Sequence, residues 1–177
     1  MSGWHDSIGE FLSQKRIAVA GVSRSGKAPG NAIYRRLLRS GYEVFAVNPL
    51  ATELEGDTCY PDLRSIPGGV DGVIITSPPS TALQIVRECA ELGIPRVWLH
   101  RSFGQGSVSQ EAVAFCLKRG IRVVARGCPL MYCGPVDPFH GIMRWILGFI
   151  GELPREAPVP GKHRSEGRPF RRRRERF

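Results

Sequence analysis

Short apolar runs alternate along the chain with segments whose apolar side chains recur at helical spacing. Each run spans three or four residues and is followed by glycine, by proline or by polar residues. Continuous apolar runs of this length are typical of strands that are buried on both faces of a parallel sheet. The runs are residues 17–20, 44–47, 73–75, 97–99 and 123–125.

Helical spacing of apolar side chains separates these runs and predicts connecting helices. One stretch carries Ala32, Ile33 and Leu37 and closes at Gly41. Strands that alternate with such helices predict parallel β-α-β units with right-handed crossovers. We therefore predict an α/β protein with a Rossmann-like, doubly wound parallel sheet of about five strands and flanking helices.

Two segments outside this alternation have their own patterns. Apolar side chains recur at helical spacing in residues 4–12, and Asp6 and Ser7 are available as caps, so a short first helix is predicted. Between the second and third runs, residues 48–70 are broken up by glycine and proline. No long helix is predicted for that link.

A second apolar stripe follows the fifth run, in residues 139–150. Its members are Phe139, Ile142, Met143, Ile146, Leu147 and Ile150. We predict a C-terminal helix that closes the sheet or forms a homodimer interface. A helix lying on a membrane is less favoured, because the polar face carries Arg144 rather than a row of bases.

Charge divides the chain into a domain and a basic tail. With 177 residues, 42% of them hydrophobic, the chain suits one core and one domain, residues 1–153. Residues 154–177 hold nine Lys or Arg and three Asp or Glu, so they carry +6 of the net charge of +9. We predict a disordered extension there. A weak nucleic-acid contact through this tail is the alternative.

Cysteine usage and hydropathy indicate the compartment. Five cysteines are scattered and lie mostly in apolar runs, unlike a disulfide framework. No apolar stretch reaches the roughly 18 residues of a bilayer span, and no secretory leader is visible. We therefore expect a cytoplasmic protein with no membrane partner. Cys128 and Cys133 lack a second pair beside them, so no metal site is predicted.

The loop after the first strand, GVSRSGKAPGN at residues 21–31, holds the main candidate chemistry. In an open parallel sheet, ligands bind beyond the carboxyl ends of the strands. Its glycines permit a tight turn and a close backbone approach; they are Gly21, Gly26 and Gly30. Arg24 and Lys27 add cations beside the free N–H groups that open the next helix, so the loop predicts a phosphate site.

Two known phosphate-binding patterns match this loop in part. The dinucleotide pattern G-x-G-x-x-G has Ser23 at its middle glycine, and the Walker A pattern has Ala28 where a hydroxyl would hold magnesium. The second strand ends in Asn48-Pro49, without the carboxylate typical of an NAD site. That rim better tolerates a phosphorylated ribose, as in NADP or coenzyme A. Residues 76–80 supply small polar side chains and another helix start.

Together these segments resemble the CoA-binding domain family, which comprises stand-alone relatives of the N-terminal domain of the succinyl-CoA synthetase alpha subunit. The ordered set is G-V-S with a downstream Gly-Lys, then N-P, P-P-S, a tryptophan-bearing strand and C-P, over about residues 17–132. The resemblance implies a Rossmann-type domain that holds coenzyme A through three loops. The candidate contacts are Gly21, Val22, Ser23, Arg24, Lys27, Gly30, Asn48, Pro49, Ser77 and Pro78.

One departure from the family pattern follows the tryptophan strand, where members often carry Gln and Gly and this chain reads WLHRSFG over residues 98–104. The departure affects the expected contacts with the pantetheine side of the ligand. We expect His100, at the end of the fourth strand, to face the first strand across the point where the winding reverses. A ligand contact or a surface position is favoured over a role as acid or base near neutral pH, because no carboxylate is placed to orient the ring.

Two function classes follow from these observations. The favoured one is a non-catalytic module that binds CoA or an acyl-CoA. The alternative is an NADP-dependent oxidoreductase or another nucleotide-binding enzyme, which would need a hydride-acceptor pocket that the sequence does not reveal. Synthetase activity is not expected without a partner, because the synthetase uses a phosphorylated histidine from a second domain.

Overall fold

The computed structural model describes residues 3–101, 106–125 and 127–133, together with Pro138, Gly141, Ile142, Trp145 and residues 155–156. The helix predicted over residues 139–150 and the tail predicted over residues 154–177 therefore lie almost wholly outside the described residues.

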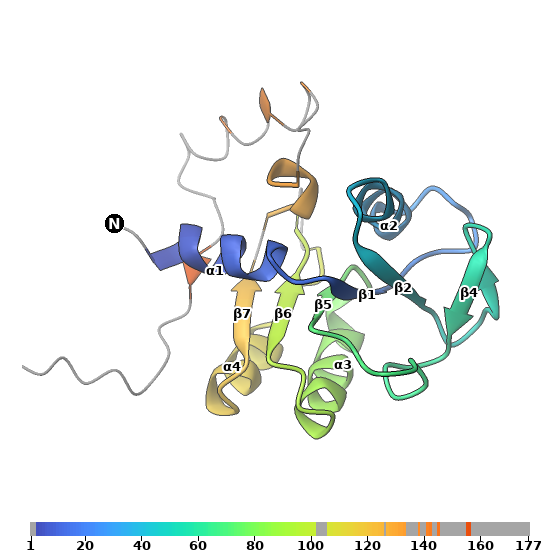
Figure 1. The fold of residues 1–177 in the computed structure, drawn as a ribbon. Coiled ribbons are helices and arrows are strands. Elements are labelled where there is room, and N and C mark those ends of the chain that lie inside the picture. The colour runs from blue at the N-terminus through green and yellow to red at the C-terminus, as the bar shows by residue number, and fades with distance from the viewer. Residues whose placement is uncertain are drawn as a thin grey trace, which may run out of the picture.

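Eight strands in the described part of the chain form one sheet, in the order β3-β4-β2-β1-β5-β6-β7-β8. The predicted strands are all present, and each runs parallel to its neighbours among them. They are β1 (Arg16–Ala20), β2 (Glu43–Val47), β5 (Gly72–Ile75), β6 (Arg96–Leu99) and β7 (Arg122–Ala125). The doubly wound, Rossmann-like α/β sheet is confirmed (Figure 1).

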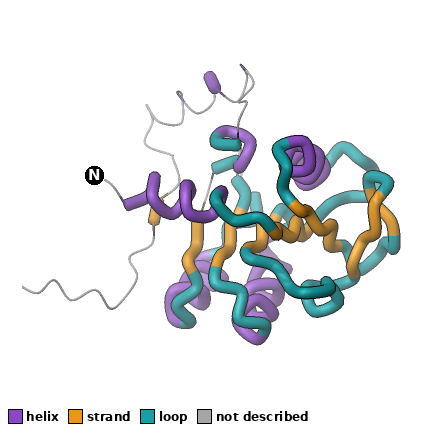
Figure 2. Tube along the Cα trace, viewed as in Figure 1, coloured by secondary structure: helices purple, strands orange, loops and turns teal. Residues whose placement is uncertain are grey.

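Helices cover both faces of this sheet. Figure 1 shows α3 (Pro79–Glu91) and α4 (Gln110–Lys118) on one face. On the other face lie α1 (Gly3–Leu12), α2 (Pro29–Arg39) and the short 3₁₀-helix η1 (Pro129–Met131). The strands therefore form a middle layer between two helical layers, which is visible as the orange row in Figure 2.

Alternate residues of β1 show how the two layers share the sheet. Ile17 and Val19 pack into the core beneath α1 and α2, whereas Ala18 and Ala20 pack into the core beneath α3 and α4. All four side chains are at most 2% exposed. Because both faces of the strand are buried from Ile17 to Ala20, none of these four positions is open to a polar side chain, and the apolar run is unbroken.

The link after β2 contains no long helix, as expected, but it does contain a hairpin that the sequence analysis missed. β4 (Asp57–Tyr60) extends the sheet parallel to β2, and β3 (Glu53–Leu54) pairs antiparallel to β4. Glu55 and Gly56 form the tip with φ of 58° and 86°, as in a two-residue type I′ turn. Strands of two to four residues at a sheet edge, with half of their side chains exposed, give no clear apolar signal. β8 (Arg155–Glu156) was missed in the same way, at the other edge.

The predicted first helix is present, but the prediction of its caps was wrong. Asp6 and Ser7 lie inside α1, which already begins at Gly3. The helix is held by its buried side: Phe11 packs edge-to-face on Trp98 of β6, with ring centroids 5.5 Å apart. Packing on β6 therefore sets where this helix lies.

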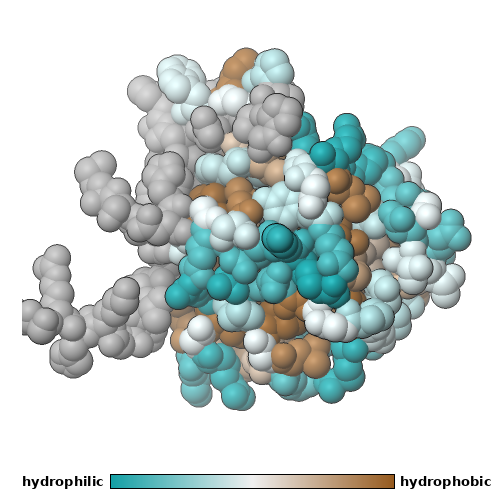
Figure 3. Space-filling view, in the orientation of Figure 1, coloured by the Kyte–Doolittle hydropathy of each residue, from teal (hydrophilic) through white to brown (hydrophobic). Residues whose placement is uncertain are grey.

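The hydropathy of the described helices and the polarity of the described surface are those of an ordinary folded domain. None of the described helices is both long and apolar enough to cross a bilayer. Hydrophilic side chains cover most of the described surface on the side shown in Figure 3, with hydrophobic spots between them. All five cysteines are free and buried, as their positions in apolar runs predicted.

Candidate functional site

The winding of the sheet reverses between β1 and β5. From β1 the chain passes through α2 to β2 on one side, whereas β5 continues through α3 to β6 on the other. The loops that follow β1 and β5, residues 21–28 and 76–78, therefore leave the carboxyl edge of the sheet side by side. The Thr76 N–H and hydroxyl both donate to the Ala20 carbonyl oxygen, at 2.8 Å and 3.1 Å. This is the place where an open α/β sheet binds its ligand.

Two glycines allow these loops to touch. A Cβ added to Gly21 would lie 2.6 Å from both the Ser77 nitrogen and Thr76 Oγ1. A Cβ on Gly30 would lie 2.6 Å from Thr76 Oγ1 and 2.7 Å from the Gly21 oxygen. Gly21 also has φ of 107°, which side chains rarely tolerate. The start of α2 and the two loops are therefore in backbone contact.

Gly26 behaves differently from the other two glycines of the loop. Apart from its chain neighbours, no atom of the described residues comes within 4 Å of the place its Cβ would take. Its φ of 68° is what favours glycine there. The close backbone approach expected at Gly26 is not made by the protein itself, and an approach by a ligand remains a prediction.

Asn31 holds the first loop in shape. Its Oδ1 accepts from the Ser23 N–H at 3.0 Å, and its Nδ2 donates to the Ser23 carbonyl at 2.8 Å. The side chain is 1% exposed, in the first turn of α2. No role was predicted for Asn31 from the sequence, although a polar residue among the buried positions of an amphipathic helix is a signal that points to it.

Asn48 joins the loop after β2 to the loop after β1. Its Nδ2 donates to the Val22 carbonyl at 2.8 Å, and its Oδ1 accepts from the Leu50 N–H at 2.9 Å. Both ends of the amide are thus bonded to the protein, which makes Asn48 a scaffold for the site. The Val22 side chain is fully buried, so a ligand could reach this residue through its backbone. Pro49 is exposed on the rim.

The two helices that follow these loops, α2 and α3, lack side-chain caps. Ala28 precedes α2 and Pro78 precedes α3, and neither side chain accepts a hydrogen bond from the helix. By contrast, Ser109 caps α4 by accepting from the Ala112 N–H at 3.3 Å. Uncapped first-turn N–H groups attract anions through their hydrogen-bonding capacity and the positive end of the helix dipole.

Cations stand beside the start of α2. Arg24 and Lys27 are exposed, and within the described part of the chain neither pairs with an acidic side chain. Ser25 stabilises the turn that carries them: its N–H donates to Ser23 Oγ at 3.2 Å, and its own Oγ accepts from the Lys27 N–H at 3.4 Å. The loop therefore presents positive charge on a backbone that is already organised.

On the other side of the point between β1 and β5 where the winding reverses, the loop after β5 has a comparable turn. The Ser77 hydroxyl accepts from Thr81 Oγ1 at 3.0 Å, and the Pro78 carbonyl accepts from the same hydroxyl at 2.9 Å. Ser77 is half-buried beside Gly21, whereas the Pro78 ring is exposed. Both predicted residues thus lie at the edge where the first loop lies.

His100 is placed differently from the expectation. It follows β6, and β5 lies between β6 and β1, so His100 sits one strand farther from the first loop than predicted. The backbone N–H of His100 donates to the Ile75 carbonyl at 3.0 Å. The residue is only 5% exposed, so the expectation of a surface position was wrong. Burial lowers its pKa to about 4, which makes the ring neutral at pH 7 and removes titration near neutral pH.

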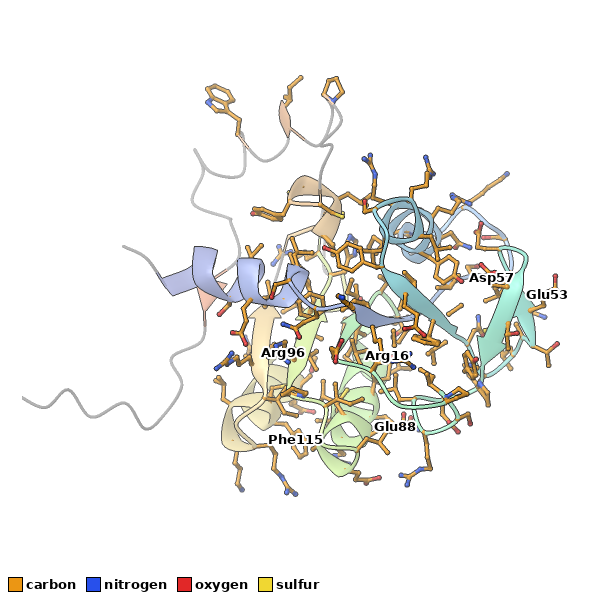
Figure 4. All side chains as sticks on the ribbon, viewed as in Figure 1. Arg16, Glu53, Asp57, Glu88, Arg96 and Phe115 are labelled. Atoms are coloured by element: carbon orange, nitrogen blue, oxygen red, sulfur yellow. The ribbon has the colours of Figure 1, made fainter. Side chains whose placement is uncertain are left out.

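A pocket of about 350 Å³ lies at the opposite edge of the sheet, between the amino ends of β1 and β5. Its polar groups are already used within the protein: Asp71 accepts from the Arg16 N–H at 2.9 Å, and the Arg16 side chain donates to the Gly69 carbonyl at 2.9 Å. Figure 4 shows Arg16 close to the starts of these strands. This edge is not where a parallel sheet places its ligand.

Known proteins are similar to this chain in sequence and in fold. The sequence profile described as the CoA binding domain matches residues 15–134. The alpha subunit of the ADP-forming acetate-CoA ligase II of Pyrococcus furiosus is 30% identical over 125 residues, which make up 67% of this chain and 27% of that subunit. The uncharacterized protein YneT of Bacillus subtilis is 29% identical over 122 residues, 68% of this chain and 87% of YneT. The chain thus spans about a quarter of the ligase subunit.

Solved structures of similar sequence share this fold. A conserved hypothetical protein from Pyrococcus furiosus is 35% identical with a TM-score of 0.56, over 64% of this chain and 93% of that protein. A hypothetical protein from Pyrococcus horikoshii is 28% identical with a TM-score of 0.66, over 72% and 88% of the two chains. The matched residues 15–134 include both loops of the crevice and all of the parallel strands, and the chain belongs to the CoA binding domain family.

Proposed function

We propose that this chain binds coenzyme A or an acyl-CoA, and that it does so as a non-catalytic module. The pyrophosphate lies at the start of α2, against residues 21–28. One observation carries the proposal: α2 begins without a side-chain cap, and Arg24 and Lys27 stand beside that start without acidic partners in the described part of the chain. In this first turn Pro29 has no N–H and the Asn31 N–H donates to the Ala28 carbonyl at 3.0 Å, so the Gly30 N–H, the helix dipole and the two cations together match a diphosphate.

The shape of the loop supports the same proposal. Asn31 holds the Ser23 peptide from both sides, and Gly30 brings the start of α2 against the loop after β5. Because this backbone is already ordered by the protein, little conformational freedom is lost when a ligand binds. Val22 then contributes its backbone N–H, while the N–H groups of Gly21 and Ser23 donate to the Val47 carbonyl and to Asn31 Oδ1 and keep the loop in shape.

The end of β2 supports coenzyme A over NAD. Asn48 and Pro49 offer no carboxylate to ribose hydroxyls. Glu55, which the hairpin brings near this region, is paired with Arg35 at 2.9 Å, so its negative charge is compensated. A phosphorylated ribose, as in coenzyme A, therefore meets no unpaired negative charge from these residues.

The properties of two candidate reactive side chains, those of His100 and Cys128, support a non-catalytic role. His100 is neutral and, with its pKa lowered to about 4 by burial, a weak base at pH 7. Cys128 is 3% exposed, so its thiol is sheltered from a ligand at the surface. The function is thus to hold the ligand, with Ser77, Pro78 and His100 on the side toward which the pantetheine arm extends.

Calorimetry with CoA, acetyl-CoA, NADP and NAD, each titrated into the full chain, tests the proposal. We expect CoA and acetyl-CoA to bind more tightly than NADP, and NAD to bind least. The double variant Arg24→Ala/Lys27→Ala should weaken CoA binding by about tenfold or more, because it removes two charge-assisted contacts to phosphate. Its thermal midpoint should stay within about 2 °C of the wild type, since both side chains are exposed.

A matched control separates a local site from general electrostatics. Arg87 and Lys118 are exposed cations on α3 and α4, away from the carboxyl edge. The double variant Arg87→Ala/Lys118→Ala removes the same charge and should leave CoA affinity within about twofold. Equal losses in the two double variants, or no CoA binding by the wild type, would overturn the proposed function.

A further inference from the structure

Glu55 has an unusual backbone conformation. It is the one non-glycine residue with a positive φ, 58°, in the described part of the chain. The left-handed region suits glycine, and asparagine to a lesser extent, and it costs free energy for a residue with a longer side chain. A residue kept in such a conformation indicates that its side chain makes contacts that a better turn former would lose.

Those contacts lead to the first turns of α2. Glu55 Oε1 accepts from Asn31 Nδ2 at 2.6 Å and from Arg35 Nη1 at 3.0 Å, and Oε2 lies 2.9 Å from the same Arg35 nitrogen. The Glu55 side chain is 13% exposed and Asn31 is buried, so water screens the contact between them weakly, whereas the Arg35 side chain is 42% exposed. One carboxylate therefore holds an amide and a guanidinium one helical turn apart.

Both partners of Glu55 continue to the backbone of loop 21–28. Asn31 bonds the N–H and the carbonyl of Ser23. Arg35 points both terminal nitrogens at the Gly26 carbonyl, at 3.4 Å each. Glu55 thus stands behind the two ends of the turn that carries Arg24, without lying in the crevice itself.

The hairpin does not depend on Glu55 for its own attachment. Asp57 accepts from the Tyr34 hydroxyl at 2.9 Å, and β4 pairs with β2. Leu54 and Cys59 are 7% and 4% exposed within the core. Figure 4 shows Asp57 on the side of the hairpin toward α2, with Glu53 at its outer edge. Loss of the Glu55 carboxylate should therefore leave the hairpin in place and release the loop.

We infer that Glu55 is a positioning residue, which keeps loop 21–28 in its ligand-binding shape through Asn31 and Arg35. The inference rests on the proposed CoA site, since it assigns a role toward that ligand. It also makes a claim about the ligand-free protein: the amides of the loop are protected from exchange because Glu55 is present. The two claims can be measured separately.

The test uses two substitutions of Glu55 in the full chain. Glu55→Asn suits the left-handed turn better but is too short to keep both partners. Glu55→Gln keeps the backbone cost and an oxygen for Asn31 but loses the charge that holds Arg35. Glu53→Asn is the control, because Glu53 lies on the same hairpin with its side chain exposed. The readouts are thermal midpoint, amide exchange without ligand, and CoA affinity.

For Glu55→Asn we expect an unchanged or raised thermal midpoint. Amide exchange should become faster in residues 22–27 and stay unchanged in residues 57–60. The affinity for CoA should fall by about tenfold, because the loop is no longer preorganised. Glu55→Gln should fall between this variant and the wild type, and Glu53→Asn should match the wild type. Wild-type exchange in residues 22–27 of both Glu55 variants would overturn the inference. Faster exchange in residues 57–60 would also overturn it, because Glu55 would then be a support of the hairpin.

Failure of the proposed function would look different from failure of this inference. If the wild type does not bind CoA, the proposed ligand is wrong, and the exchange data alone decide whether Glu55 positions the loop. If the wild type binds CoA but both Glu55 variants bind it equally well, the ligand stands and the positioning role is refuted.

Discussion

Gly30 stands in the first turn of α2, where replacing glycine by alanine would ordinarily stabilise a helix by about 0.5–1 kcal/mol. Here a Cβ would lie 2.6 Å from Thr76 Oγ1 and 2.7 Å from the Gly21 carbonyl oxygen. Neither neighbour moves easily, because Gly21 is backbone and the Thr76 hydroxyl is bonded to the Ala20 carbonyl. Overpacking of this kind costs about 1–3 kcal/mol, which exceeds the gain in helix propensity. We expect Gly30→Ala to lower the free energy of unfolding by about 1–2 kcal/mol.

Gly9 supplies the matched control for this substitution. It lies in the middle of α1, is exposed, and has no atom within 4 Å of its would-be Cβ. Gly9→Ala should therefore raise the free energy of unfolding by about 0.5–1 kcal/mol. Urea denaturation of both variants at one pH measures the difference in sign. Adding Thr76→Ala to Gly30→Ala removes one of the two close contacts and should restore part of the lost stability, because the contact with Gly21 remains.

The same substitution tests the geometry of the site. Pushing α2 away from the loop after β5 displaces the N–H groups that would hold a phosphate, so Gly30→Ala should also weaken CoA binding by about tenfold. Gly9→Ala should leave CoA affinity unchanged. The reasoning is refuted if Gly30→Ala gains stability as Gly9→Ala does, since the close approach at Gly30 would then not exist in solution.

Two further predictions concern stability away from the loop. Glu10→Gln removes the ion pairs with Arg96 and Arg122 that join α1 to the starts of β6 and β7. The free energy of unfolding, measured in urea, should fall by about 1 kcal/mol. Glu91→Gln is the control at a well-exposed ion pair and should change this free energy by less than about 0.5 kcal/mol. Burial lowers the pKa of His100 from 6.5 to about 4, so between these pH values the unfolded chain binds a proton that the folded chain excludes, and stability should fall as pH falls through that window. His100→Gln should flatten this part of the pH dependence measured by thermal unfolding, and equal slopes in variant and wild type would contradict the assignment.

Much of the fold could be predicted from the sequence because its signals are local. Each of the five predicted parallel strands is largely buried on both faces, so an unbroken apolar run marks it wherever it stands in the sheet. The helices between the strands show their buried stripes in the same way. The short strands β3 and β4 lack such a signal: half of their side chains are exposed, and their pairing depends on the edge that β2 offers.

The candidate loop was also visible in the sequence, through its glycines and cations, and the match of residues 15–134 confirms the family. Its supports were not visible. Asn31 and Glu55 are separated by 24 positions, and nothing in either neighbourhood reveals that they bond. The expectation for His100 failed for a similar reason: its distance from β1 depends on β5 lying between, and its burial depends on segments that come from elsewhere in the chain.

The sequence by itself therefore determined the alternation of strands and helices, the doubly wound class and the loop that carries the charge, because periodicity and composition are properties of neighbouring residues. Only the tertiary structure decided which groups stand behind that loop, which histidine is buried and which glycine must stay a glycine. These depend on contacts between segments that are distant along the chain, where the free energy of an interaction is set by the distance and the exposure of its partners.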